Sequence, residues 1–208
     1  MPSQYSSSHS LEDAISLAQN LGIRFDIVPI KDIFDQYIFT LQPLFAGMPE
    51  NVTEENLQAR IRAMLLMAVS NKYGNILLNT SNKSEVAVGY GTLYGDVCGA
   101  ISVLGDVYKT EVYRLAHFIN RDRIIVPLNT INKAPSAELR PGQKDSDSLP
   151  PYEVLDQILY EHIENGKGST EIVELGFDAQ MVENILRKVR FNEFNRRQAP
   201  PVLRVSRK

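Results

Sequence analysis

The stretch NILLNTSNKSEVAVGYGTLYGD, from Asn75 to Asp96, joins a short apolar run to a long polar segment. The run NILLN (Asn75–Asn79) has the length of a buried strand, and the hydroxyls and glycines that follow it suit a loop. Elsewhere the chain alternates short strands with long helical patterns. This order favours an α/β domain that has a parallel sheet with helices on both faces. In such sheets ligands bind outside the carboxyl ends of the strands, which is where residues 80–96 begin.

The composition is that of a globular protein with one sizeable domain. The 208 residues are 43% hydrophobic and 23% charged, with a formal net charge of −3. These values argue against a general nucleic-acid-binding or membrane-surface protein, and no apolar run is long enough to span a bilayer. The only cysteine, Cys98, cannot form an internal disulfide, so we expect a cytoplasmic protein. The histidines, His9, His117 and His162, lack the spacing of metal ligands.

Three helices and one strand are predicted before Asn75. The first helix should begin at Ser10 and end before Gly22. Next, RFDIVPI (Arg24–Ile30) has apolar residues on both faces, which is typical of a mostly buried strand. A second helix should cover Lys31–Phe45, and Thr53 should cap a long third one. The inner face of that long helix is expected to include Leu57, Ile61, Met64, Leu65 and Ala68.

Beyond the polar stretch we expect a helix from about Lys109 to Asn120, and then a long polar segment, residues 126–156. Loops of this length are usually functional lids or disordered connectors, and the residues leave both possibilities open. Residues 1–208 are expected to form one domain, with a helical and basic tail over residues 152–208. Its helices should cover Tyr152–Asn165, Ser169–Leu175 and Asp178–Arg190.

Glu85 is the one acid near the start of the polar stretch. Thr80, Ser81 and Ser84 supply hydroxyls around it, and the first N–H groups of a helix would favour an anion. A carboxylate at this place suits Mg²⁺, which prefers oxygen ligands. An acid in the first turn of a helix also interacts well with the helix dipole. The residues alone leave both roles open.

Several cations could meet the anionic groups of a substrate: Arg60, Arg62, Lys109 and Lys144. Lys109 is unusual because the dipole at a helix N-terminus disfavours a cation, which makes a phosphate partner attractive. Its alternative role is that of an ordinary solvated lysine. Ser136 lies in the long polar segment, which has the composition of a lid that closes over phosphates.

Taken together, long stretches of the chain resemble the NAD⁺ synthetases, specifically the synthetase domain of the glutamine-dependent form. The stretches are MPSQYSSSHSLEDA, LLNTSNKSEVAVGYGTLYGDVCGAISVLGDVYKTEVYRLA, KAPSAELRPGQKDSDSLPPYEVLD and NEFNRRQAPP. The resemblance implies a Rossmann-like, adenine nucleotide alpha hydrolase-like fold of the ATP pyrophosphatase type. It also implies the amidation of deamido-NAD⁺ to NAD⁺ through an acyl-adenylate, with ATP and Mg²⁺. Ammonia would come from a glutaminase domain, the chain would form a homo-oligomer, and neither nucleic acid nor membrane would be a partner.

Residue roles follow from the same resemblance. Ser3, Tyr5 and Ser6 would lie near the adenine of ATP, and Lys109 and Ser136 would contact its phosphates. The residues implied to bind ATP are therefore Ser3, Tyr5, Ser6, Thr80, Lys109 and Ser136.

On the substrate side, Asn56 and Arg60 would face deamido-NAD⁺. Glu85 would bind Mg²⁺ or lie beside deamido-NAD⁺. The family commonly has a lysine where Asn195 stands, so Arg196 would supply the cation instead.

The chain departs from the family's pattern at its start. The pyrophosphate-binding segment of the form SGGxDS, with its metal-binding aspartate, normally precedes the MPSxYSS segment, and no SGG run occurs in the sequence. We therefore expect a fragment of a longer protein in which Met1 is an internal methionine. A parallel sheet that lacks its first strand would expose apolar surface and open edges. A smaller departure, Leu93 and Ala100 in place of charged residues, fits the glutamine-dependent branch.

Two alternatives remain open from the sequence. The chain could be another amidating ligase of the ATP pyrophosphatase type, such as a GMP synthetase or an asparagine synthetase, although their middle motifs are not found. It could also be a catalytically incomplete nucleotide-binding or dimerisation module. The long helix from Thr53 is a candidate dimer face, and its apolar residues would equally suit an ordinary core.

Overall fold

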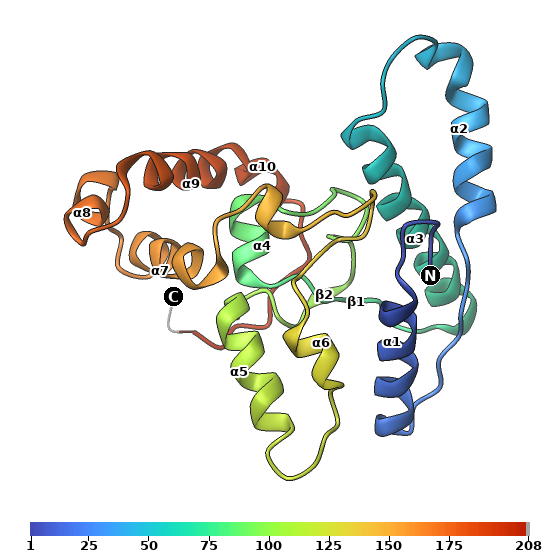
Figure 1. Ribbon diagram of the computed structural model, residues 1–208, viewed down its shortest axis with the longest axis horizontal. Helices are drawn as coiled ribbons and strands as arrows, with labels where there is room; N and C mark the ends of the chain where they lie inside the picture. Colours follow the sequence, from blue (N-terminus) through green and yellow to red (C-terminus); the bar gives the residue numbers. More distant parts are fainter. Residues whose placement is uncertain (207–208) are drawn as a thin grey trace. The chain divides into compact units, whose positions relative to one another are not determined.

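The computed structural model describes residues 1–206 and consists of two compact units. The first unit contains Met1–Ala68 and Tyr113–Ser148, and the second contains Val69–Val112 and the chain from Leu149 onward. Figure 1 shows the elements along the chain. None of the described helices is long and apolar enough to cross a membrane. Each unit is described by itself below.

The first unit begins with helix α1 (Ser8–Leu21), followed by α2 (Lys31–Phe45). The predicted start of α1 at Ser10 is wrong, because the hydroxyl of Ser7 accepts a hydrogen bond from the backbone N–H of Ser10 at 3.2 Å and so caps the helix. Gly22 ends α1 in the left-handed conformation, as the sequence predicts. The prediction for α2 is confirmed at both ends.

Helix α3 (Val52–Tyr73) contributes most of its length to the first unit. Asn51, and not the predicted Thr53, caps it: the Asn51 side chain accepts from the Thr53 N–H, and Glu54 accepts from the Asn51 N–H at 2.7 Å. Ile61 is buried as expected and packs with Ile30 and Phe34.

The predicted inner face of α3 is partly wrong. Leu57 and Leu65 pack beside the core, but Met64 is 66% exposed and Ala68 is exposed. Gln58 is fully buried instead, because its Nε2 donates to the carbonyl of Leu139 at 2.8 Å and the polar segment covers it. The buried face is therefore shifted toward the side that meets residues 133–148.

Residues Arg24–Ile30 do not form the predicted buried strand. Ile30 is buried and donates its N–H to the Pro2 carbonyl at 2.9 Å, but Phe25 and Ile27 are 44% and 46% exposed. A strand forms only where a neighbouring segment pairs with its backbone groups. Within residues 1–206 no strand is paired with this segment, so its apolar side chains stay exposed.

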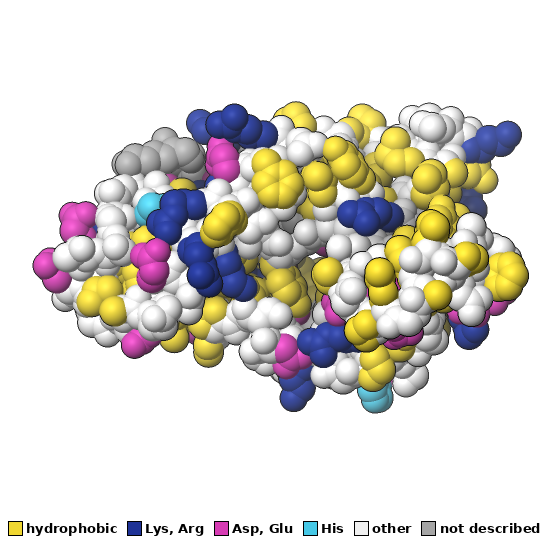
Figure 2. Space-filling view, turned by 90° about the horizontal axis from the view of Figure 1, so that it is seen from above, with side chains coloured by type: hydrophobic (Ala, Val, Ile, Leu, Met, Phe, Trp, Pro, Cys, Tyr) yellow, Lys and Arg dark blue, Asp and Glu magenta, His cyan; other side chains and the backbone are white. Residues whose placement is uncertain are grey.

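Apolar side chains are also exposed on α2 and α3. Figure 2 shows hydrophobic groups over much of the surface on the side where α2 lies. The most exposed are Leu44, Phe39, Met64 and Tyr73. An apolar surface of this kind often marks a contact with another chain.

The second unit contains the sheet. Strand β1 (Leu78–Asn79) pairs in parallel with β2 (Ile101–Ser102), so that Leu78 is opposite Ile101. Val202 of the tail forms one more parallel bridge, to Ser102. The predicted parallel pairing is confirmed. Only the end of the run NILLN is paired, however, and Ile76, near its start, is 72% exposed. β2 was not predicted, since its paired part is only 2 residues long.

Helices pack together beside this sheet. α4 (Lys83–Val88) packs against α7 (Tyr152–Ile163) and α9 (Ala179–Phe191), and α8 (Ser169–Glu174) packs against both of the latter (Figure 1). Their shared core includes Leu155, Ile158, Leu159, Ile172 and Val182. The three predicted C-terminal helices are thus confirmed, with ends that differ by a residue or two.

Short helices account for the remaining regular structure. α5 (Lys109–Ile119) matches its prediction, and α10 (Glu193–Arg196) extends the tail. The long polar segment contains α6 (Leu128–Asn132) and a 3₁₀ helix, η1 (Asp145–Asp147). Residues 126–148 of this segment are therefore a folded part of the first unit rather than a featureless connector.

Candidate functional site

Asn79 ends strand β1 and organises the polar loop that follows it. The residue is 2% exposed, and its Nδ2 donates to the carbonyl of Asp96 at 2.8 Å. Its Oδ1 accepts from the backbone N–H of Ser81 and from the hydroxyl of Ser102. One buried amide thus connects both ends of residues 80–96 to β2. Thr80 lies exposed at the start of this loop.

Glu85 belongs to the first turn of α4. Asn82 caps that helix, and a capping box is complete: Asn82 Oδ1 accepts from the Glu85 N–H at 3.0 Å, and Glu85 Oε2 accepts from the Asn82 N–H at 3.1 Å. Glu85 is therefore the helix-start acid that the sequence left open. Its other oxygen, Oε1, lies 3.1 Å from Nζ of Lys109 and forms an ion pair.

Lys109 begins α5, and its cation is held in place by neighbours. Besides the ion pair, Nζ lies 5.3 Å from the centre of the Tyr152 ring. Both charged side chains are mostly buried, with 19% exposure for Lys109 and 18% for Glu85. The carboxylate and the ring offset the unfavourable helix dipole at this position.

A chain of hydrogen bonds fixes the start of α5. The N–H of Lys109 donates to the hydroxyl of Ser84 at 2.9 Å, and that hydroxyl donates to Oδ1 of Asp156 at 2.5 Å. The other oxygen of Asp156 accepts from the Thr110 N–H at 2.8 Å. Ser84 is fully buried and Asp156 is 5% exposed. Side chains of α4 and α7 together satisfy the first N–H groups of α5.

Neither a role for Asp156 nor this use of Ser84 is predicted from the sequence. A signal for Asp156 was present, because helical spacing puts it on the same face of α7 as Tyr152, Leu155 and Leu159, which are apolar and buried. An acid on the apolar face of a helix requires a hydrogen-bonding partner.

A solvent-open pocket lies beside Glu85, and the empty space of about 290 Å³ there includes open solvent. Arg196 lines it from the tail, with Nη1 donating to the Ala87 carbonyl at 2.8 Å and Nη2 to the Val189 carbonyl at 2.6 Å. The pocket is lined by Ser81, Glu85, Val86, Gly89, Tyr90, Gly91, Val97, Asn195, Arg196 and Ala199. Two of the residues predicted to bind substrate therefore face one cavity of the second unit.

A buried ion cluster lies on another side of α4. Nζ of Lys83 contacts Asp106 at 2.8 Å and Glu164 at 2.5 Å. Burial alone would raise the pKa of Asp106, but hydrogen bonds from Lys83 and from the N–H groups of Ser206 and Val205 hold that pKa far below its usual range. Asp106 thereby ties the tail to the start of α4.

The other predicted residues belong to the first unit. Ser3, Tyr5 and Ser6 form a turn in which the Ser3 N–H donates to Ser6 Oγ at 3.0 Å. Asn56 is half-buried on α3, and Arg60 is exposed there.

Ser136 is engaged within its own loop. Its hydroxyl donates to the Gln143 carbonyl at 2.6 Å and accepts from the Glu138 N–H at 3.1 Å. A phosphate that accepts a hydrogen bond from the Ser136 hydroxyl would therefore replace the Gln143 carbonyl as its acceptor.

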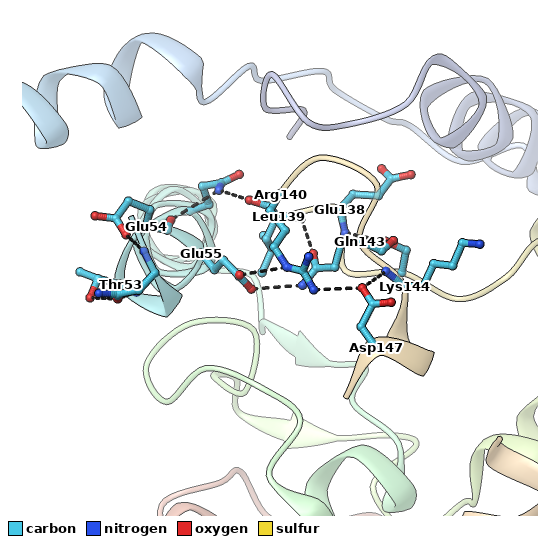
Figure 3. Close-up of polar contacts among 12 residues, drawn as sticks. Thr53, Glu54, Glu55, Glu138, Leu139, Arg140, Gln143, Lys144 and Asp147 are labelled. Carbon is cyan, nitrogen blue, oxygen red and sulfur yellow. Dashed lines mark hydrogen bonds and ion pairs between the residues drawn. The ribbon is translucent and has the colours of Figure 1, made fainter. Parts of the chain in front are cut away.

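The loop that carries Ser136 is attached to α3 by polar contacts. Figure 3 shows Arg140 and Gln143 converging on Glu55, with Arg140 Nε 3.3 Å from Oε1 and Gln143 Nε2 3.1 Å from Oε2. Arg140 also pairs with Asp147 at 3.0 Å. These contacts place the loop beside the part of α3 that carries Asn56.

Comparison with known proteins identifies the family. The model of the NAD synthase family matches residues 1–199. A "Glutamine-dependent NAD(+) synthetase" of Thermotoga maritima is 52% identical over 208 residues, which is 99% of this chain and 36% of that protein. The chain thus spans little more than a third of the relative's length.

Solved structures show the same fold. The glutamine-dependent NAD⁺ synthetase from Acinetobacter baumannii, in complex with ADP, aligns with a TM-score of 0.64 and 44% identity over 99% of this chain and 37% of that one. An NMN synthetase from Francisella tularensis aligns with a TM-score of 0.77 and 28% identity over 94% of this chain and 73% of that one. The α/β, adenine nucleotide alpha hydrolase-like fold expected from the sequence is thereby confirmed. This chain belongs to the NAD synthase family.

Proposed function

We propose that the chain is the synthetase part of a glutamine-dependent NAD⁺ synthetase, which amidates deamido-NAD⁺ to NAD⁺ with ATP. The observation that carries the proposal is the pairing of Glu85 with Lys109 at the edge of a pocket that follows strand β1. Family membership and the names of the relatives support the same reaction. In this proposal the ammonia comes from a glutaminase domain, and the reaction takes place in the cytoplasm.

The chemistry requires that two anionic substrates be held together. The nicotinate carboxylate is a poor electrophile until it attacks the α-phosphorus of ATP, forming an acyl-adenylate and releasing pyrophosphate. Ammonia then attacks the acyl carbon, and AMP leaves. Lys109 would stabilise the negative charge of the phosphates, and the hydroxyl of Thr80 would contact the nucleotide from the start of the same loop.

Mg²⁺ fits the donor set at Glu85. Among residues 1–206 no group of three His, Cys, Asp or Glu side chains could hold a metal ion. Mg²⁺ is commonly bound by one or two carboxylates together with substrate phosphates, and one carboxylate facing a pocket meets that requirement. Glu85 would hold the ion, which would neutralise phosphate charge.

The remaining assignments follow the sequence prediction. We propose that Ser3, Tyr5 and Ser6 lie at the adenine and that Ser136 meets the phosphates. Asn56, Arg60 and Arg196 would face deamido-NAD⁺. For Arg196, the pocket that it lines supports this assignment.

We also propose that the chain forms homo-oligomers. The exposed apolar side chains of α2 and α3, such as Phe39, Leu44 and Met64, support a contact with a second copy. Sedimentation equilibrium would show a dimer or larger species, whereas a monomer at all concentrations would contradict this part of the proposal.

Equilibrium dialysis with labelled ligands tests the function. The proposal predicts that the chain binds deamido-NAD⁺ more tightly than nicotinate mononucleotide, and ATP–Mg²⁺ more tightly than GTP–Mg²⁺. Tighter binding of nicotinate mononucleotide would favour a mononucleotide substrate, and tighter binding of GTP–Mg²⁺ would favour another nucleotide. No binding of any of the four ligands by the folded chain would overturn the proposal.

A further inference from the structure

Glu138 connects two distant segments of the first unit. Its Oε1 accepts hydrogen bonds from the hydroxyl of Ser10 at 2.6 Å and from that of Ser7 at 2.9 Å. Its Oε2 accepts from the backbone N–H of Ser7 at 3.3 Å. The carboxylate therefore holds the long polar segment against the N-terminus of α1, although the two are more than a hundred residues apart in sequence.

The surroundings keep this carboxylate ionised. Burial by itself would raise the pKa of Glu138, but the hydrogen bonds from Ser10 and Ser7 and the nearby cation of Lys133 lower that pKa below its ordinary value. Nζ of Lys133 also donates to the hydroxyl of Ser10 at 2.7 Å. Charged hydrogen bonds of this kind are stronger than neutral ones.

The backbone of Glu138 adopts a conformation that glutamate rarely takes. Its φ is 50°, in the left-handed region. Non-glycine residues persist there only where their surroundings hold them, and the contacts to Ser7 and Ser10 do so. In this conformation the Glu138 N–H donates to the hydroxyl of Ser136.

We propose that Glu138 is a positioning residue for ATP, which holds Ser136 and the turn of Ser3–Ser6 in one fixed arrangement before the nucleotide binds. Glu138 lies 2 residues from Ser136 and contacts the residue that follows Ser6. This inference rests on the proposed function, in which both segments contact ATP. In this inference Glu138 acts through Ser136 and the Ser3–Ser6 turn, and it is not itself a ligand of the nucleotide.

Two substitutions at Glu138 distinguish the effect of its side-chain contacts from the effect of its backbone conformation. Glu138→Asn keeps a residue that tolerates positive φ but is too short to replace the carboxylate. Glu138→Gln keeps an oxygen that can accept from the hydroxyls of Ser7 and Ser10, so it should still hold the loop in part. Ser10→Ala removes the shortest bond from the other side. Glu12→Gln is the matched control, since it removes one exposed carboxylate from α1.

Two measurements on the whole chain decide the question. Hydrogen exchange of residues 134–144 should become at least several-fold faster in Glu138→Asn and Ser10→Ala, less so in Glu138→Gln, and remain unchanged in Glu12→Gln. The dissociation constant of ATP–Mg²⁺ should rise about tenfold in Glu138→Asn, while that of deamido-NAD⁺ stays within about twofold.

The outcomes distinguish this inference from the proposed function. Unchanged exchange in Glu138→Asn and Ser10→Ala would overturn the holding role itself. Faster exchange with unchanged ATP affinity, or an equal loss of affinity for both ligands, would overturn the positioning role. If the unsubstituted chain binds deamido-NAD⁺ and not ATP, the ATP part of the proposed function fails, and the assignment of Glu138 falls with it.

Discussion

Nζ of Lys109 lies 3.1 Å from Oε1 of Glu85, and the two side chains neutralise one another at the edge of the pocket. The proposed function assigns both to the triphosphate end of ATP, one as a cation and one as a metal ligand. In the chain without substrate, the Lys109 cation and the Glu85 carboxylate therefore neutralise each other. Under the proposed function, the binding of ATP–Mg²⁺ would separate this pair.

Replacing Glu85 by Gln should weaken the binding of ATP–Mg²⁺ without unfolding α4. The amide oxygen of Gln can still accept from the Asn82 N–H, so the capping box survives while the proposed metal ligand is lost. We expect a rise of about tenfold or more in the dissociation constant, or roughly 1.4 kcal/mol, measured by titration calorimetry.

The control for this change is Glu171→Gln. Glu171 occupies the same capping position in α8, where its Oε2 accepts from the Gly168 N–H at 2.9 Å. ATP affinity should be unchanged in this variant. An equal loss of affinity in both variants would mean that general charge, and not the position of Glu85, controls binding.

Replacing Asp156 by Ala should destabilise the second unit strongly. The change leaves the Ser84 hydroxyl and the Thr110 N–H without their acceptor, and each buried unsatisfied group costs about 1–3 kcal/mol. Urea unfolding should show a loss of roughly 2–4 kcal/mol. Gln157→Ala, at the exposed neighbour on α7, should cost less than about 0.5 kcal/mol. Similar losses for the two variants would contradict the account of how α5 is anchored.

Gly89 and Gly22 form a matched pair of substitutions. Both have a positive φ, 70° and 64°, so alanine is strained at each. A Cβ at Gly89 would lie 2.0 Å from the Asn192 side chain, which bonds to the Val88 carbonyl, whereas a Cβ at Gly22 meets nothing within 4 Å. Gly89→Ala should therefore destabilise by about 1–3 kcal/mol more than Gly22→Ala in thermal unfolding. Equal effects would show that Asn192 moves away at little cost.

Asp106 should contribute to stability above acidic pH. Its pKa is depressed in the folded protein, so its contribution is present above the unfolded-state pKa of about 3.9 and is lost as the pH falls below it. Other acids with depressed pKa values, such as Glu138, add to the same slope. The free energy of unfolding should thus fall less steeply between about pH 5 and pH 3 in Asp106→Asn than in the unsubstituted chain. An unchanged slope would contradict the role of the Lys83–Asp106 pair.

Local signals in the sequence predicted most helices correctly. Lys31–Phe45 was predicted at both ends, and the C-terminal helices were predicted within a residue or two, because periodicity and caps are short-range features. The errors at Ser10 and Thr53 arose where several adjacent residues were able to cap, and the hydrogen-bond geometry selected Ser7 and Asn51.

Long-range features were predicted less well. Whether Arg24–Ile30 becomes a strand depends on a partner segment, and the period of its side chains carries no information about that partner. For the candidate site, the sequence proposes separate roles for Glu85 and Lys109, which stay predictions, and it does not predict the contact of these two side chains with each other. The hydrogen-bond partners of Asp156 and Glu138 lie far away in sequence, so no local pattern reveals which residues they contact.

Hydrogen exchange of the chain with and without ATP–Mg²⁺ locates the bound nucleotide. If the nucleotide binds at the Glu85–Lys109 pair, exchange should slow in residues 80–88 and 106–112, which contain Thr80, Glu85 and Lys109, and should not change in α8. Binding of ATP–Mg²⁺ that leaves both of these segments unchanged would contradict the claim that the Glu85–Lys109 pair forms the nucleotide site.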